Sequence, residues 1–251
     1  MKYFIFLISL IVFLFFSIFM FGQNTIIFSE YVEGSSFNKY IEIYNPTSNS
    51  INLDDYHYNF CWNGCDSSQW EFSIPFDSNM VLMPHETYVI SHYNADSVLL
   101  NVSDQTTSLM SNGNDVIGIL YLPTNSIVDV IGEFSSVAPS NGWDIGSDIN
   151  ATKDHTLIRN SIVCEGNNGD WSLSDGSINF SEWTVYPVDY FSDIGIHSSN
   201  CNSGTLIIDN QNESNLILIK DVLGRSINED KNIILFYIYD DGSVKKRVIV
   251  K

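Results

Sequence analysis

The chain has 251 residues, enough for one large or two small domains with a buried core. Hydrophobic residues make up 44% and charged residues 16%, which excludes an intrinsically disordered chain. The net charge of −19 disfavours nucleic-acid binding, which needs Lys and Arg to displace counterions from phosphates. Anionic membranes are disfavoured as partners for the same reason, and we expect no nucleic-acid partner.

Residues 1–22 have the pattern of a secretory signal peptide. Lys2 precedes an almost unbroken apolar run over residues 3–21, and polar residues begin after Gly22. An uncleaved membrane anchor is the competing interpretation, since the run is close to the roughly 20 residues that span a bilayer. Cleavage is favoured because Gly22 is small and no basic stop-transfer cluster follows. We therefore expect a mature chain that begins near Gln23 and has no membrane span.

Four cysteines follow the signal, and an even number in an exported chain predicts disulfides. They are Cys61, Cys65, Cys164 and Cys201. The short spacing of Cys61 and Cys65 favours a bond between these two, which leaves Cys164 to pair with Cys201. A zinc site is the weaker alternative, because three residues separate the first two cysteines and no paired Cys or His motif follows.

Residues 24–197 show little helical periodicity, and short β-branched and aromatic runs recur between polar turns. The pattern predicts antiparallel strands at residues 25–32, 39–44, 56–60, 70–74, 88–91, 116–120, 127–131, 156–159 and 183–185. In the second of these, alternation places Ile41 and Ile43 on one face and Tyr40, Glu42 and Tyr44 on the other. Many short strands with polar turns indicate an all-β sandwich.

Asp129 stands inside an apolar strand. It could be a ligand-binding carboxylate, but a carboxylate that caps a neighbouring loop is the favoured interpretation.

Several segments over residues 24–197 resemble, in order, those of bacterial lamin tail domains. They are SEYVEGSS at 29–36, NKYIEIYNPT at 38–47, SNGND at 111–115, IVDVIG at 127–132, HTLIR at 155–159, EW at 182–183 and DIGIH at 193–197. The resemblance implies an immunoglobulin-like β-sandwich, in agreement with the strand pattern, and implies no shared enzymatic activity. We assign residues 23–204 to this domain.

The chain changes character near Gly204. Residues 23–204 hold 23 acidic and three basic side chains, whereas the seven acidic and seven basic residues of 205–251 balance. The second part contains β-rich segments at 206–208, 216–219, 233–239 and 244–250, with a turn at 240–243 between the last two. A second module, a miniature β-sandwich, is predicted for residues 205–251.

This second module resembles the C-terminal sorting domain of type IX secretion through KDVLGR at 220–225 and LFYIYDDGSVKKRVIVK at 235–251. The resemblance implies passage across the outer membrane by the type IX machinery, usual removal of the tail, and a protein that is secreted or held at the cell surface. The positions that carry it are Lys220, Asp221, Leu223, Gly224, Arg225, Tyr237, Tyr239, Asp240, Asp241, Gly242, Lys245 and Lys246. The alternative is a plain terminal hairpin that completes the main sandwich.

The sequence contains no Gly-rich phosphate loop, nucleophile elbow or paired zinc motif, so we expect no cofactor and assign no catalytic residue. Its five histidines are scattered, and its five tryptophans are expected in the core rather than in a sugar-binding platform. A calcium site near Asp144, Asp148, Asn150 and Asp154 is a further hypothesis, since calcium takes several oxygen ligands.

Two functions follow as hypotheses. The favoured one is a non-catalytic extracellular or cell-surface binding or adhesion module for an unknown surface glycan or protein. The alternative is a secreted hydrolase or an accessory domain of one. A pocket with convergent carboxylates and histidines would favour the enzyme, whereas a flat face or loop rim would favour binding.

Overall fold

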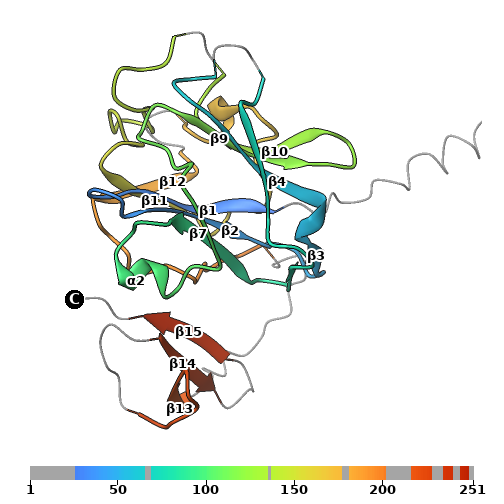
Figure 1. The fold of residues 1–251 in the computed structure, drawn as a ribbon, viewed down its shortest axis with the longest axis vertical. Helices are drawn as coiled ribbons and strands as arrows, with labels where there is room; N and C mark the ends of the chain where they lie inside the picture. The colour runs from blue at the N-terminus through green and yellow to red at the C-terminus, as the bar shows by residue number, and fades with distance from the viewer. Residues whose placement is uncertain are drawn as a thin grey trace, which may run out of the picture.

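The computed structural model describes residues 26–65, 69–134, 137–176, 181–201, 216–227, 234–239 and 244–248. Two β-sheets form a sandwich over residues 26–201, and a third sheet follows near the C-terminus (Figure 1). The predicted signal at residues 1–22 lies outside the described residues. Within the described part of the chain, no helix has the length and apolar character needed to cross a membrane.

The first sheet has six strands in the order β12-β11-β1-β2-β7-β8. Their bounds are β1 Ile27–Glu33, β2 Lys39–Tyr44, β7 Thr87–His92, β8 Gln105–Thr107, β11 His155–Arg159 and β12 Trp183–Pro187. All pairings in this sheet are antiparallel except that of β7 with β8, which is parallel. The expectation of purely antiparallel strands is therefore wrong at this edge, where α2 (Ser97–Leu100) carries the chain from β7 to β8.

The second sheet has four antiparallel strands in the order β10-β9-β4-β5. Their bounds are β4 Tyr56–Cys61, β5 Phe72–Pro75, β9 Val116–Tyr121 and β10 Ser126–Ile131. A two-stranded ribbon of β3 (Ile51–Asn52) and β6 (Val81–Leu82) lies outside both sheets, and two short 3-10 helices cover Leu53–Asp55 and Trp171–Leu173.

All nine strands predicted for residues 24–197 are present, with ends shifted by one or two residues. The pattern missed β3, β6 and β8, which have two or three residues each. Alternation needs at least four residues to be visible, so such short strands are set by their neighbours rather than by their own sequence.

The two sheets face each other across one hydrophobic core, and β2 shows how the sequence produces it. Ile41 and Ile43 point into this core, whereas Tyr40 belongs to a second apolar cluster on the outer face of the first sheet. The predicted alternation of β2 is thus confirmed. In β1 a register shift between Phe28 and Glu30 lets both Phe28 and Tyr31 reach the core.

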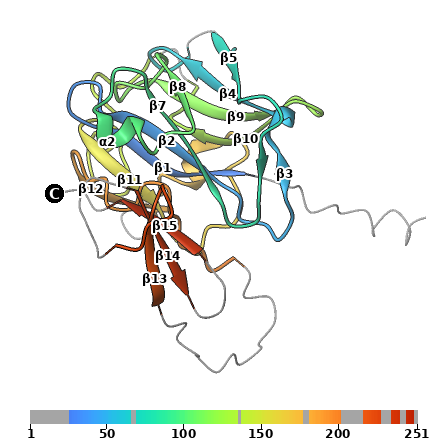
Figure 2. The ribbon, with the colours of Figure 1, turned by 60° about the horizontal axis from the view of Figure 1, so that its bottom comes forward.

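The C-terminal part forms one antiparallel sheet of β13 (Leu216–Asp221), β14 (Ile234–Tyr239) and β15 (Val244–Val248), in that order. These strands match three of the four predicted segments, and residues 206–208 lie outside the described part. The described residues of this part form a three-stranded antiparallel layer, β13-β14-β15. In two views the first sheet lies between the second sheet and this C-terminal sheet (Figures 1 and 2).

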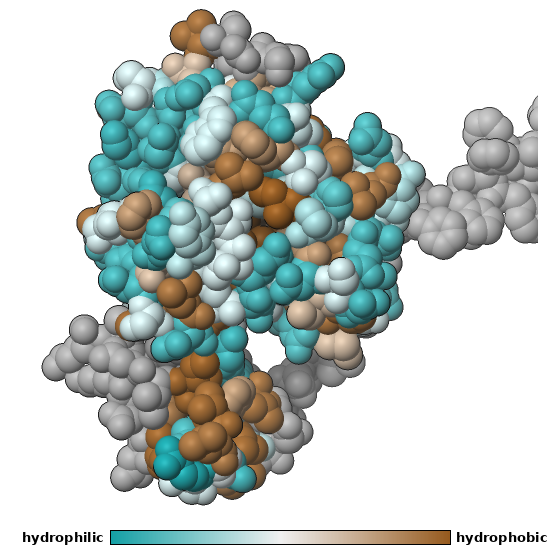
Figure 3. Space-filling model, viewed as in Figure 1, coloured by the Kyte–Doolittle hydropathy of each residue, from teal (hydrophilic) through white to brown (hydrophobic). Residues whose placement is uncertain are grey.

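The surface of the C-terminal sheet is more apolar than that of the sandwich in the view of Figure 3. Its exposed apolar side chains are Ile217, Val222, Leu223 and Val244.

Candidate functional site

The buried carboxylate of Asp129 in β10 joins three segments. Its oxygens accept the backbone N–H groups of Phe28 at 3.0 Å and of Asn167 at 3.0 Å. Phe28 belongs to the first sheet, and Asn167 belongs to the loop that follows β11. The expectation that Asp129 caps a neighbouring loop is confirmed, and the same group also links the two sheets.

Arg159 on β11 is the cation that balances Asp129. Its Nη1 donates to Asp129 Oδ2 at 3.1 Å, and its Nη2 donates to Glu182 Oε2 at 2.6 Å. The guanidinium also lies over the Trp183 ring, 4.6 Å from its centroid. Burial raises the pKa of Glu182 and the Arg159 charge opposes that rise. Arg159 and Asp129 are fully buried, so the pair is a structural ion pair.

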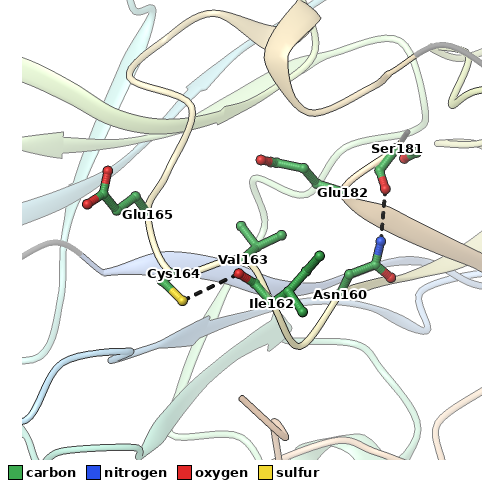
Figure 4. Close-up of a pocket in the computed structure, with 7 residues that line it drawn as sticks. All are labelled: Asn160, Ile162, Val163, Cys164, Glu165, Ser181 and Glu182. Carbon is green, nitrogen blue, oxygen red and sulfur yellow. Dashed lines mark hydrogen bonds between the residues drawn. The ribbon is translucent and has the colours of Figure 1, made fainter. Parts of the chain in front are cut away.

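Beside this ion pair lies an open pocket of about 640 Å³ (Figure 4). It is lined by Asn160, Ile162, Val163, Cys164, Glu165, Ser181 and Glu182. In the close-up, the Glu165 and Glu182 side chains come from different segments, with Ile162 and Val163 between them. The pocket is therefore lined by two acidic and two apolar side chains, among others. Sequence reasoning missed this site, because its lining residues come from two segments that only the sandwich brings together.

The Ser181 and Asn160 side chains of the pocket are hydrogen-bonded to neighbouring segments. The Ser181 hydroxyl donates to the Ser174 carbonyl at 3.4 Å and accepts the Trp183 N–H at 2.9 Å. The Asn160 amide donates to the Ser181 carbonyl at 2.9 Å and accepts the Thr184 hydroxyl at 2.7 Å. No histidine is among the described residues that line the pocket.

Both predicted disulfide pairs are at bonding distance. Cys61 and Cys65 have their sulfur atoms 2.01 Å apart, and Cys164 and Cys201 have theirs 2.15 Å apart. Neither pair leaves a thiolate free for zinc, and no other cysteine exists in the chain. The second bond fastens the loop that forms the pocket wall at Cys164 to the end of the sandwich at Cys201.

The described residues offer no metal-binding cluster. Within the described part of the chain, no group of three His, Cys, Asp or Glu residues is placed to hold a metal ion. In the proposed calcium loop, Asp144 Oδ1 instead accepts the Asn150 backbone N–H at 2.8 Å. Burial lowers the pKa of His197 to about 4, and its ring packs edge-on against Tyr44.

The tryptophans serve mainly the core, as expected. Trp143, Trp171 and Trp183 are buried, and Trp70 packs against the core cluster. Trp62 is 39% exposed, where it packs edge-on against Phe60.

The described residues of the segment that resembles a sorting domain lie in the C-terminal sheet and in the turn after β13. Asp221 at the end of β13 closes the following turn, because it accepts the backbone N–H groups of Leu223 and Arg225 and the Arg225 Nε–H. Gly224 takes a positive φ of 76° in that turn. The remaining described positions of the motif are Lys220 on β13, Tyr237 and Tyr239 on β14, and Lys245 and Lys246 on β15. Asp240, Asp241 and Gly242 lie outside the described residues.

Comparison with known families places residues 21–135 on the model of the Lamin Tail Domain. The match spans β1 to β10. After it, β11 pairs with β1 and β12 pairs with β11, which completes the first sheet. The fold is accordingly an immunoglobulin-like β-sandwich. No curated protein and no solved structure matches the chain.

Proposed function

We propose that this protein is an exported, non-catalytic module that binds an extracellular or cell-surface partner through the pocket beside Glu182. The observation that carries the proposal is the state of that pocket's polar groups. Glu182 is held by Arg159, and the Ser181 hydroxyl donates to a backbone carbonyl. Polar groups that are held in fixed positions suit a site that binds and orients a partner.

The partner is a surface glycan or a protein, and the pocket lining favours one that presents a positive charge beside an apolar group. Glu165 and Glu182 supply negative charge, and Ile162 and Val163 supply the apolar contact. The sandwich part of the chain carries 23 acidic and three basic residues, so its long-range field attracts cations. A basic protein segment fits these properties better than a neutral glycan.

An array of glycans and proteins probed with the purified chain tests this function. We expect Ile162→Ser to weaken capture of the best partner about tenfold, because it removes an apolar contact at the pocket. The matched control is Ile149→Ser, since Ile149 is 73% exposed and Ile162 is 75% exposed, and it should leave capture unchanged.

Equal loss in both variants would contradict the pocket assignment. Turnover in a panel of glycosidase, esterase, protease and nuclease substrates, abolished by Glu182→Gln, would instead establish the secreted hydrolase.

We also propose that the C-terminal sheet is a type IX sorting signal that delivers the protein to the cell surface or medium. The support is the sequence resemblance at residues 220–251 and the separate sheet that part of this segment forms. Deletion of residues 220–251 is expected to leave the protein in the periplasm, as measured by cell fractionation. Fusion of residues 205–251 to an unrelated signal-peptide-bearing protein is the control, and should export it. Normal surface delivery of the truncated chain would contradict the sorting role.

A further inference from the structure

Two glutamates face each other on the outer side of the first sheet. Glu30 on β1 pairs across the strands with Glu42 on β2, and both are buried, at 1% exposure. Cross-strand partners project from the same face, so their carboxylates share one site. Neither residue takes part in the pocket or in the Asp129 ion pair. Two buried like charges are unfavourable unless other groups compensate them.

Hydrogen bonds from the sandwich itself hold this carboxylate pair. The Ser29 hydroxyl donates to Glu42 Oε1 at 2.7 Å, and the Gly195 N–H donates to Glu42 Oε2 at 2.6 Å. The Tyr40 hydroxyl donates to Glu30 Oε1 at 2.6 Å. Burial is the largest cause of the raised pKa of Glu30. It is also the largest cause of the raised pKa of Glu42, which is about 7. All three of these hydrogen bonds come from residues of the sandwich rather than from the C-terminal sheet.

The C-terminal sheet brings a cation to this site. Lys246 on β15 lies directly over Gly195, because a methyl group added to Gly195 would be 3.3 Å from Lys246 Cε and 3.7 Å from its Nζ. Gly195 is the residue whose N–H binds Glu42. The ammonium of Lys246 accordingly lowers the pKa of Glu42 and so stabilises its ionised form.

An apolar contact accompanies this charge. Lys246 pairs with Phe236 across β14 and β15, so it shares a face of the C-terminal sheet with Ile234. Ile234 packs against the second apolar cluster of the sandwich, which contains Val32, Tyr40, Val89, Ala95, Leu99, Val102 and Ile194. One face of the C-terminal sheet thus presents a lysine and an isoleucine to a face of the sandwich that offers a buried acid pair and an apolar cluster.

We propose that the outer face of the first sheet is a docking surface for a lysine-bearing β-sheet. Its occupant is the C-terminal sheet of this chain, through Lys246 and Ile234. Protonation of Glu42 loosens the contact. The docking surface does not depend on the route of export. The charged groups around this docking surface are Glu30 and Glu42 on the first sheet, Asp193 in the segment after β12, Asp104 before β8, and Lys246.

The sign of the pH dependence follows from linkage. Lys246 favours ionised Glu42, so ionised Glu42 favours docked Lys246 to the same extent. Docking is therefore strongest above pH 7 and weakens as the pH falls through about 7, where Glu42 takes up a proton.

Energy transfer between dyes at Ile162 and Ile217 of the intact chain tests this proposal, because both side chains are exposed, at 75% and 65%. We expect docking to be about tenfold less favourable at pH 5.5 than at pH 8, seen as a lower transfer efficiency. In Lys246→Gln, the transfer efficiency at pH 8 should be as low as that of the unchanged protein at pH 5.5, and it should no longer change between the two pH values. Glu42→Gln, which mimics the protonated side chain, should do the same.

The matched control is Lys245→Gln. Lys245 is the neighbouring lysine, but it projects from the opposite face of the C-terminal sheet, over the Tyr239 ring at 5.3 Å from the centroid. It should keep both the docked state and its pH dependence. Transfer that is unchanged by Lys246→Gln at pH 8, equally reduced by Lys245→Gln, or higher at pH 5.5 than at pH 8 would overturn the proposal. Near-ultraviolet circular dichroism of each variant separates undocking from unfolding of the sandwich.

Discussion

Replacement of Asp129 by alanine is expected to lower the free energy of unfolding by about 3–5 kcal/mol, the usual cost of removing one partner of a buried ion pair. The change leaves the fully buried guanidinium of Arg159 without its partner from β10. It also leaves the backbone N–H groups of Phe28 and Asn167 without their acceptor. Urea unfolding of the purified variant, followed by tryptophan fluorescence, measures the loss.

Two further variants sharpen this prediction. Glu182→Gln changes the other partner of Arg159, whose side chain is 30% exposed, and should cost less than about 1 kcal/mol. Asp129→Leu combined with Arg159→Met removes both buried charges, and should be less destabilising than Asp129→Ala, because no unpaired charge remains. A loss below 1 kcal/mol in Asp129→Ala would contradict the central role of this carboxylate.

Removal of the bond between Cys164 and Cys201, by changing both to alanine, is expected to cost about 4 kcal/mol. The two residues are 37 positions apart, and loop-closure entropy in the unfolded chain grows with that separation. The bond also fastens the pocket wall, so partner capture should weaken along with stability. Thermal unfolding of the oxidised protein and of the variant gives the difference.

The pair Cys61 and Cys65 is the control, because its separation of four predicts a cost of only about 2 kcal/mol. A larger loss of stability on removing the Cys61–Cys65 bond than on removing the Cys164–Cys201 bond would contradict this explanation from the entropy of the unfolded chain.

The C-terminal sheet has two roles in our proposals, which are testable separately. Export depends on recognition of residues 205–251 by secretion machinery, whereas docking depends on Lys246 and Ile234 against the outer face of the sandwich. A variant such as Ile234→Ser, at a residue outside the positions that carry the sorting resemblance, would show that the two roles are independent if it is undocked but still exported. Failure of export with intact docking would remove the sorting role and leave the docking surface standing.

The sequence by itself determined the strands of four or more residues, the all-β class and the cysteine pairs. The alternation of Ile41 and Ile43 with Tyr40 and Glu42 is a local property of β2, because successive side chains of a strand must point to opposite faces. The cysteine pairs followed from count and spacing, since Cys61 and Cys65 are too close in the chain to prefer other partners.

The tertiary structure alone decided which side chains meet. Asp129, Arg159 and Glu182 come from three segments, as do Glu30, Glu42 and Lys246, and no local pattern records such distances in space. The short β3, β6 and β8 were also invisible, because two or three residues are too few to show alternation and each of these strands is defined by a partner elsewhere in the chain. Strand formation is a local choice, whereas pockets, ion pairs and docking faces arise from contacts between residues far apart in the chain.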